Sequence, residues 1–448
     1  MKIVHIVPGM GGSFYCENCV RDGDLVNGLR ALGHDVILVP LYLPLSVDGE
    51  LVETGAPLFF GAISTYLKER FPLLRKLPWW SGKLLDSRYL LNIAAAKAGS
   101  TRAAGLEEMT YSMIQGEQGH QANELNHLVG WLKDNVKPDI IYLANALLIG
   151  LVKELKRNLQ VPIICALEDE DIWIDDMEPR WQQRIWTTIR ERARDVDTFV
   201  VVSDYYRNRI QAKLRIPEQQ IHTVHIGIDL TGFEAVTSNA EPVVIGYLSR
   251  ITEAFGLDIL VDAFILLKSE PEFQRLKLRI TGGATTDDHQ YISDIKQKLI
   301  KAKVYDDVEF VSHFDRESRL EFLRSLSLLS VPARRKEAYG LFQIEALAAG
   351  VPTVQPHTGA FPEITELTGG GVTYEPNDAS TLATQLRSLL KNPDRIQVLG
   401  RRGQEAVFAK LSNMTMAKNM LKIYQEAINR NVDSDQNQRT GEIDATET

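Results

Sequence analysis

The chain has 448 residues, of which 44% are hydrophobic and 24% are charged. At roughly 100–200 residues per domain, this length predicts two large domains or three small ones in a globular protein. The net charge of -9 argues against a general nucleic-acid binder, which would carry a basic surface, so no nucleic-acid partner is expected. Three cysteines are too few for a disulfide framework and fit the reducing cytoplasm, where we place the protein.

Neither a signal peptide nor a membrane-spanning helix is expected. The apolar run in residues 1–7 is too short for a signal peptide and ends at the turn Pro8-Gly9. The longest apolar stretch, residues 140–152, falls well short of the ~20 residues that a membrane-spanning helix needs.

Short runs rich in Val and Ile alternate with helical patterns along most of the chain. This alternation is typical of βαβ units with parallel sheets that are buried on both faces. A glycine-rich loop, residues 8–13, follows the first expected strand, and a helix is expected over residues 24–32. Strands of the first half are expected at 3–7, 36–39, 139–143, 161–166 and 198–202.

Residues 66–102 interrupt this rhythm within an expected insertion at about 66–125. They carry eight basic residues against two acidic ones, together with Phe71, Trp79, Trp80 and Tyr89. Basic residues attract anionic lipid headgroups, and interfacial tryptophans add an apolar anchor. The segment is therefore interpreted either as a contact with the acceptor or an anionic membrane, or as an ordinary helical insertion on the first domain.

A second βα series begins after the weakly apolar linker at residues 231–242. Its strands are expected at 243–248, 276–281, 308–311, 328–331 and 352–355. We therefore assign an N-terminal Rossmann-like domain to residues 1–238 and a C-terminal one to residues 239–412. A helix at 413–430 is expected to pack back on the first domain, and the polar tail 431–448 is expected to be disordered.

The strongest chemical signal is the run Glu337-Ala-Tyr-Gly-Leu-Phe-Gln-Ile-Glu345. A strand leads into it and a helix over 342–349 follows, so Glu337 lies at the carboxyl end of a strand, where open parallel sheets bind ligands. The N–H groups of Gly340, Leu341 and Phe342 form a helix N-terminus suited to a diphosphate. Glu345 suits a ribose diol and Glu337 suits sugar hydroxyls. The alternative is a capping loop with a glutamate that neutralises the helix dipole.

This run resembles the E-x7-E motif of retaining GT-B glycosyltransferases, and the wider pattern resembles glycosyltransferase family 4. Matching segments elsewhere are Pro8-Gly-Met-Gly-Gly12, Leu32-Gly-His-Asp-Val36, Val224-His-Ile-Gly-Ile-Asp229 and Gly359-Ala-Phe-Pro-Glu363. The resemblance implies two facing Rossmann-like domains with the active site in the cleft between them. It also implies a hexosyltransferase that takes a sugar from a nucleotide-diphosphate sugar with retention of configuration, and that needs neither a cofactor nor a metal.

The resemblance assigns further site residues to this chain. Glu337 and Arg250 are the expected catalytic residues, with the Arg250 charge stabilising the leaving diphosphate; the alternative for Arg250 is a surface salt bridge. Glu345, Gly340, Leu341 and Phe342 are expected to bind the donor. Gly11 and Gly12 would let the first domain approach the donor closely, or would simply form a tight turn.

Three positions depart from the family pattern. Phe255 stands where a lysine is usual, although Arg334, Arg335 and Lys336 are close enough along the chain to supply a cation. Glu168-Asp169 replaces a usual His-Asp pair; we assign both residues to the acceptor side and expect the acidic run that they begin to be solvated rather than to bind a hard cation. His225-Ile226 replaces a usual Pro-Asn.

Some alternatives remain open. Cys16-Glu-Asn-Cys19 has a spacing typical of redox or zinc sites, but no second pair completes a zinc site, so a structural role is favoured over redox or metal chemistry. The rivals to an active transferase are a GT-B scaffold without turnover, which the missing lysine motivates, and a GT-B nucleotide-sugar epimerase. The acceptor is expected to be a carbohydrate or a lipid-linked molecule, which would allow a peripheral position at the inner face of the membrane.

Overall fold

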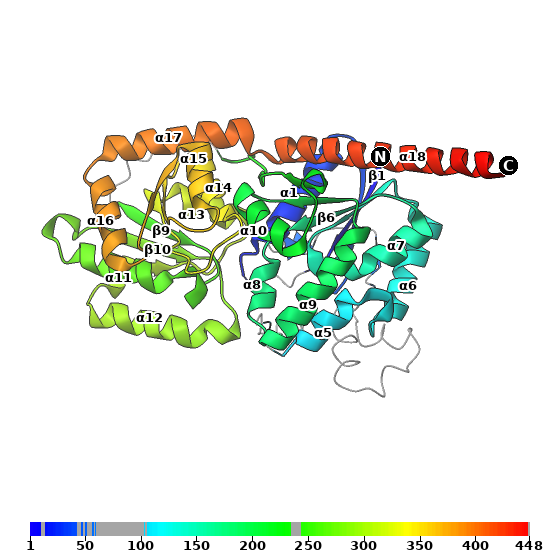
Figure 1. Ribbon diagram of the computed structural model, residues 1–448. Helices are drawn as coiled ribbons and strands as arrows, with labels where there is room; N and C mark the ends of the chain where they lie inside the picture. Colours follow the sequence, from blue (N-terminus) through cyan, green and yellow to red (C-terminus); the bar gives the residue numbers. More distant parts are fainter. Residues whose placement is uncertain are drawn as a thin grey trace.

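Two six-stranded parallel sheets, each flanked by helices, form two lobes that lie side by side (Figure 1). This computed structural model describes residues 1–9, 14–42, 46–47, 50–51, 56–57, 59, 103, 105–233 and 243–446. The predicted fold class, two Rossmann-like domains, is confirmed. The expectations for Gly11 and Gly12, for the basic segment 66–102 and for the domain boundary near residue 238 lie outside the described residues.

The first sheet has the strand order β2-β1-β5-β6-β7-β8. Nearly all residues in its central strands are buried, because helices cover both faces of the sheet. The five predicted strands are present; β8 was not predicted, since its short Ile-His-Thr sequence gives no apolar run. The bounds are β1 (Lys2–Val7), β2 (Asp35–Pro40), β5 (Ile140–Leu143), β6 (Ile163–Leu167), β7 (Thr198–Val201) and β8 (Ile221–Thr223), beside a small hairpin of β3 (Ser46–Val47) and β4 (Glu50–Leu51).

The helices of the first domain connect these strands. The first of them, α1 (Glu17–Ala31), begins seven residues before the predicted start at residue 24. Its first turns bury the charged residues Arg21, Asp22 and Asp24 beside Cys19 and Val20, so the hydrophobic pattern does not reveal them. The others are α5 (Glu107–Ile114), α6 (Ala122–Trp131), α7 (Val152–Leu159), α8 (Glu170–Asp175), α9 (Pro179–Arg192) and α10 (Asp204–Leu214).

The second sheet has the order β11-β10-β9-β12-β13-β14, so the chain reverses direction across the sheet between β9 and β12. In open parallel sheets, ligands bind outside the carboxyl ends of the strands at this reversal. The strands are β9 (Val244–Leu248), β10 (Lys277–Thr281), β11 (Val308–Phe310), β12 (Leu328–Leu329), β13 (Thr353–Pro356) and β14 (Gly371–Tyr374). The helices are α11 (Leu257–Lys268), α12 (His289–Lys301), α13 (Arg316–Arg324), α14 (Leu341–Ala348), α15 (Phe361–Thr368), α16 (Ala379–Leu390) and α17 (Pro393–Lys410).

The last helix, α18 (Asn413–Thr446), leaves the second domain and runs along the first, where it packs on α1 (Figure 1). The Asn413 N–H donates to the Ile228 carbonyl at 2.7 Å, and Arg430 donates to Thr198 Oγ1 at 2.8 Å. The backbone is helical through Thr446, where disorder was expected from residue 431. Residues 431–446 contain no proline and a single glycine, Gly441, so the sequence holds no strong helix breaker.

No helix in the described part of the chain combines the length and the apolar character that crossing a membrane requires.

Candidate functional site

The predicted motif lies at the reversal point of the second sheet. Arg250 follows β9 by two residues, and Glu337 lies in the loop between β12 and α14. These are the two strands between which the strand order reverses. The topology therefore brings the two expected catalytic residues to the edge where a ligand is expected.

Glu337 is a buried carboxyl group that is paired with a cation. Its side chain is 4% exposed, and Arg335 Nε donates to its Oε1. Burial raises the pKa of Glu337 to about 7; the nearby Asp169 carboxylate acts in the same direction, whereas Arg335 opposes it. Near neutral pH the group is therefore available both as a hydrogen-bond donor and as an acceptor, which suits contact with sugar hydroxyls.

Arg335 also lies over the ring of Phe255, with its guanidinium carbon 4.2 Å from the ring centroid. Phe255 is the residue that replaces the lysine usual in family 4. Guanidinium groups stack favourably on aromatic faces. The structure thus places a cation from the neighbouring loop at the position where the expected lysine is missing. Arg334, by contrast, is taken up by a two-point ion pair with Asp258.

The N-terminus of α14 holds a carboxylate. Gly340 precedes the helix as its N-cap with φ of 90°, a conformation that glycine adopts at little cost. The Leu341 N–H donates to Glu17 Oε2, which comes from the first turn of α1 in the other domain. Burial raises the pKa of Glu17, and the nearby Glu337 adds to that effect. The helix end predicted to bind a diphosphate therefore binds an acidic side chain of the protein itself.

Glu345 is fully buried and both of its oxygens have partners. Arg319 of α13 donates to Oε1 through Nε at 3.1 Å and Nη2 at 2.9 Å, and the Tyr15 hydroxyl donates to Oε2 at 2.8 Å. Burial raises the pKa of Tyr15, so its hydroxyl stays protonated and able to donate. The predicted ribose-binding carboxylate is therefore engaged by a hydroxyl group of the first domain.

Arg250 takes part in a partly buried ion pair. Its Nε and Nη2 donate to Asp288 Oδ2 at 3.1 and 2.9 Å, and Nη2 also donates to Thr285 Oγ1 at 2.9 Å. The ring of Phe14 covers the guanidinium with its centroid 4.9 Å away. The salt bridge that the sequence offered as an alternative is present, although it lies at the strand end rather than on open surface. Phosphate binding by Arg250 stays a prediction.

The acidic run that begins at Glu168 was expected to be solvated, and this is wrong for its first part. Glu168, Glu170 and Asp171 are buried, whereas Asp175, Asp176 and Glu178 further along are exposed. Glu168 pairs with Arg21 at 2.7 Å, and Glu170 accepts backbone N–H bonds from Ala146 at 2.8 Å and Glu168 at 2.9 Å. These donors allow the carboxylates to be buried at the start of α8.

The proposed acceptor-side residues Glu168 and Asp169 differ in their positions. Glu168 lies within the first domain, held by Arg21. Asp169 faces the other domain, where its Oδ1 accepts the Ala338 N–H at 3.2 Å. Burial raises the pKa of Asp169, while Arg335 opposes the shift. Of the two residues, only Asp169 is therefore placed beside Glu337 and its loop.

Sequence reasoning missed Tyr15, Glu17 and Arg319. Tyr15 and Glu17 flank Cys16 directly after the glycine loop, and this adjacency was the signal that could have drawn attention to them. Arg319 carries no motif. Its role depends on the packing of α13 against α14, which no local pattern reveals.

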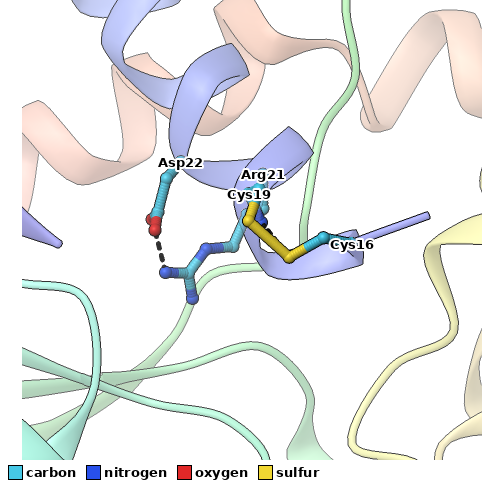
Figure 2. Close-up of a disulfide and its surroundings, with 4 residues drawn as sticks. All are labelled: Cys16, Cys19, Arg21 and Asp22. Atoms are coloured by element: carbon cyan, nitrogen blue, oxygen red, sulfur yellow. Dashed lines mark hydrogen bonds and ion pairs between the residues drawn. A yellow bond between two sulfur atoms is a disulfide. The ribbon is translucent and has the colours of Figure 1, made fainter. Parts of the chain in front are cut away.

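Cys16 and Cys19 form a disulfide at the start of α1 (Figure 2). Among the residues that the structure describes, no group of three or more His, Cys, Asp or Glu side chains could hold a metal ion. Figure 2 also shows Arg21 and Asp22 of the same helix, which are joined by an ion pair at 2.5 Å.

Solved structures share this architecture. The chain matches Anabaena HepE in complex with UDP with a TM-score of 0.66 and 14% identity, covering 95% of this chain and 100% of that one. It matches sucrose-phosphate synthase from Thermosynechococcus elongatus with a TM-score of 0.68 and 16% identity, covering 95% and 99% of the two chains. At these identities the likeness shows only the fold. The shared fold, two facing Rossmann-like domains, is GT-B.

The sequence comparisons give the family. Residues 231–406 match the family described as Glycosyl transferases group 1, and residues 112–231 match Glycosyltransferase Family 4. The two matches meet at residue 231 and together cover residues 112–406, which include parts of both domains. The chain belongs to the GT-B glycosyltransferases of the family 4 type, and the resemblance noted in the sequence is confirmed.

Curated relatives cover the chain to different extents. The lipopolysaccharide core biosynthesis mannosyltransferase LpsB of Rhizobium meliloti is 33% identical over 127 residues, which are 28% of this chain and 34% of LpsB. The N-acetyl-alpha-D-glucosaminyl L-malate synthase of Bacillus anthracis is 23% identical over 303 residues, covering 65% of this chain and 75% of that enzyme. The match to LpsB thus spans about a third of its length.

Proposed function

We propose that the protein is a hexosyltransferase that moves a sugar from a nucleoside-diphosphate sugar to a carbohydrate or lipid-linked acceptor, with retention of configuration and without a cofactor. The observation that carries this proposal is the N-terminus of α14. Its Leu341 N–H already binds the Glu17 side chain, the buried residues Glu337 and Glu345 belong to the same motif, and Arg335 binds Glu337 from just before it. An anion, a ribose and a sugar could all be recognised there.

Each group has a role that follows from its charge. The diphosphate takes the place of the Glu17 carboxylate at the α14 N-terminus, where N–H donors and the helix dipole favour negative charge. Arg335 and Arg250 stabilise the charge that develops as the diphosphate leaves. Glu345 accepts ribose hydroxyls in place of the Tyr15 hydroxyl, and Glu337 contacts the transferred sugar. Asp169 faces this position from the acceptor domain.

The names of relatives agree with such a reaction. The Anabaena HepE structures contain UDP and UDP-glucose, and LpsB is named as a mannosyltransferase of lipopolysaccharide core biosynthesis. The alternative hypothesis, a GT-B scaffold without turnover, rested on the absence of a lysine at Phe255. Arg335 stacks on Phe255 and supplies a cation at the same place, which weakens the case for that alternative.

Titration calorimetry with uridine, guanosine and adenosine diphosphates, in the presence of a thiol reductant, tests the donor site. We expect one of them to bind, and we expect Glu337→Ala and Glu345→Ala to lose at least ~10²-fold in transfer rate while staying folded, each tenfold step being 1.4 kcal/mol. Glu321→Ala is the control, because Glu321 is an exposed residue of α13. Failure of all three nucleotides to bind at millimolar concentration would leave the scaffold interpretation in place of the transferase.

The acceptor side of the proposal includes residues 66–102. Their excess of basic residues suits an acceptor on an anionic membrane, with the protein at the cytoplasmic face. Sedimentation with anionic and neutral liposomes at low salt measures the preference for anionic lipid. Equal binding to both kinds of liposome would contradict the proposed membrane contact. Nuclear magnetic resonance of the product reports whether the anomeric configuration is retained.

A further inference from the structure

Residues 14–17 of the first domain occupy the proposed donor site. Phe14 forms a bridge with Gly283, and the Tyr15 N–H donates to the Gly282 carbonyl at 2.9 Å, so the segment is bonded to the loop that follows β10 in the second domain. The Tyr15 hydroxyl binds Glu345 at 2.8 Å, and the Glu17 carboxylate binds the Leu341 N–H. The Phe14 ring covers Arg250.

These contacts use the groups that a donor would use, an inference that rests on the proposed function. The Glu17 carboxylate occupies the anion position at α14, and the Tyr15 hydroxyl occupies the position of a ribose hydroxyl on Glu345. One N–H cannot serve Glu17 and a phosphate oxygen equally well, and the second oxygen of Glu345 is already bonded. Binding of a nucleoside diphosphate therefore competes with residues 14–17.

The Cys16–Cys19 disulfide holds this segment at its centre. Cys16 stands between Tyr15 and Glu17 and caps α1, where its Sγ accepts the Cys19 N–H at 3.3 Å (Figure 2). Cys16 is partly exposed and Cys19 is buried, so an external thiolate reaches the Cys16 sulfur first. A helix N-terminus also favours the thiolate form of a cysteine. Both features are typical of a disulfide that exchanges with other thiols.

We propose that Cys16 and Cys19 form a redox-active pair that controls access of the nucleotide to the donor site through residues 14–17. An external dithiol reduces the pair. Its first thiolate attacks Cys16 Sγ, the Cys16–Cys19 bond breaks, and Cys19 leaves as a thiolate that takes up a proton. The second thiolate of the dithiol then attacks the mixed disulfide and releases Cys16. Two electrons and two protons pass to the pair, and the external dithiol becomes a disulfide.

The oxidised pair favours occupation of the site by the protein itself. A cross-link that keeps a ligand in its bound conformation reduces the entropy that binding costs. The disulfide does this for Tyr15 and Glu17, because it fixes the residue between them to the first turn of α1. Reduction removes the cross-link, the segment leaves Leu341 and Glu345 more readily, and a nucleoside diphosphate binds more tightly.

The experiment compares nucleotide affinity in the two redox states of the full chain. Alkylation followed by mass measurement of the intact protein establishes the state of each cysteine. Calorimetry then gives the dissociation constant of whichever of uridine, guanosine or adenosine diphosphate binds. We expect reduction to lower the dissociation constant of the wild type by threefold or more. A smaller change, a change in the opposite direction, or failure of Cys16 and Cys19 to interconvert overturns the proposal.

Three variants separate this control from other effects. Cys165→Ser removes the third cysteine, which is buried and free in β6, and should keep the full redox dependence. Cys16→Ser with Cys19→Ser should remove the dependence and bind as the reduced wild type does. Tyr15→Phe with Glu17→Gln should give the oxidised protein the affinity of the reduced one; no gain there also overturns the proposal. Absence of binding in every state and variant would instead overturn the proposed function.

Discussion

At the scale of single residues, Phe255, which stands where family 4 usually has a lysine, is best understood together with Arg335. The guanidinium of Arg335 stacks on the Phe255 ring and pairs with Glu337. Nearby carboxylates raise the pKa of Arg335 although burial opposes them, so the group stays charged. Arg335 therefore keeps a positive charge next to Glu337, in the loop that leads into α14.

This pairing makes a prediction about compensation. Arg335→Ala should weaken nucleoside-diphosphate binding by at least ~10-fold, about 1.4 kcal/mol, because a cation is removed from a buried anion site. Adding Phe255→Lys to that variant should restore most of the affinity. Arg334→Ala, which removes an exposed arginine paired with Asp258, should change the affinity less than about twofold. Calorimetry measures all three, and undiminished binding in Arg335→Ala would contradict the assignment.

Glu337 makes stability depend on pH. Burial raises the pKa of Glu337 from its ordinary 4.5 to about 7. The folded state therefore holds this proton where the unfolded state has lost it, and the contribution to stability disappears as pH rises from about 4.5 through 7. Glu337→Gln should stabilise the nucleotide-free protein by about 1–3 kcal/mol at pH 8 and hardly at all at pH 4.5.

Urea unfolding at the two pH values tests this expectation. Glu366→Gln, at an exposed position in α15, is the matched control and should shift neither curve. A Glu337→Gln variant that is less stable than the wild type at pH 8 would contradict the pKa shift. The gain in stability should accompany a loss of transfer, as is common when a strained functional group is removed.

The sequence predicted the site residues only where their neighbours along the chain determine their position. Glu337 and Glu345 follow a strand and enclose a helix start, so their spacing alone places them at the sheet edge. Tyr15, which binds Glu345 from 330 residues away, could not be placed, because that contact depends on how the two domains face each other. The burial of Glu168 was missed for a similar reason, since Arg21 supplies its charge partner from another helix.

At the scale of elements, the motif ending in Glu363 joins the two domains. This residue of α15 accepts the N–H groups of Asp204 and Tyr205, the first residues of α10, at 2.9 and 2.8 Å. His225 Nε2 lies 2.8 Å from Glu363 Oε1. Burial acts to raise the pKa of Glu363, but the hydrogen bonds from His225 and the two N–H groups outweigh it and keep the pKa below its ordinary value.

Removing this charge should loosen the contact between α15 and α10. Glu363→Gln keeps one acceptor oxygen but loses the charge, so we expect a loss of about 1–2 kcal/mol in the free energy of unfolding at pH 7. For a carboxyl group with a lowered pKa, the stabilisation is present above its unfolded value and is lost as pH falls through the folded value. The difference between variant and wild type should therefore vanish in acid. Chemical unfolding at pH 7 and pH 3.5 measures it, and an equal loss at both would argue against a charge effect.

Element prediction succeeded for strands with several consecutive apolar residues and failed for short or polar ones. The strands β8 and β14 each present few apolar side chains at the end of a sheet, and neither was predicted. The early start of α1 was hidden because three charged residues, Arg21, Asp22 and Asp24, are buried in its first turns. Periodicity of apolar residues cannot reveal a helix whose first turns bury charged side chains.

At the scale of the whole molecule, the chain crosses between the domains twice. It enters the second domain after residue 233 and returns when α18 begins at Asn413. Ile228 and Ser412 form a bridge where these two crossings lie side by side. The seam between α18 and α1 therefore fixes the end of the second domain to the first, and its packing should influence how the domains face each other around the donor site.

Gly28 of α1 lies at this seam and tests it. A Cβ atom at Gly28 would lie 2.8 Å from the Asn413 carbonyl oxygen and 3.0 Å from the Ala417 Cβ, so a side chain there must push α18 away. Gly28→Ala should lower the free energy of unfolding by about 1–3 kcal/mol despite the better helix propensity of alanine. Gly130→Ala in α6 is the matched control, because nothing lies within 4 Å of its added Cβ, and it should be neutral or stabilising. Urea unfolding measures the free energy of unfolding of both variants. A Gly28→Ala protein as stable as the control would show that α18 does not pack on α1 this closely.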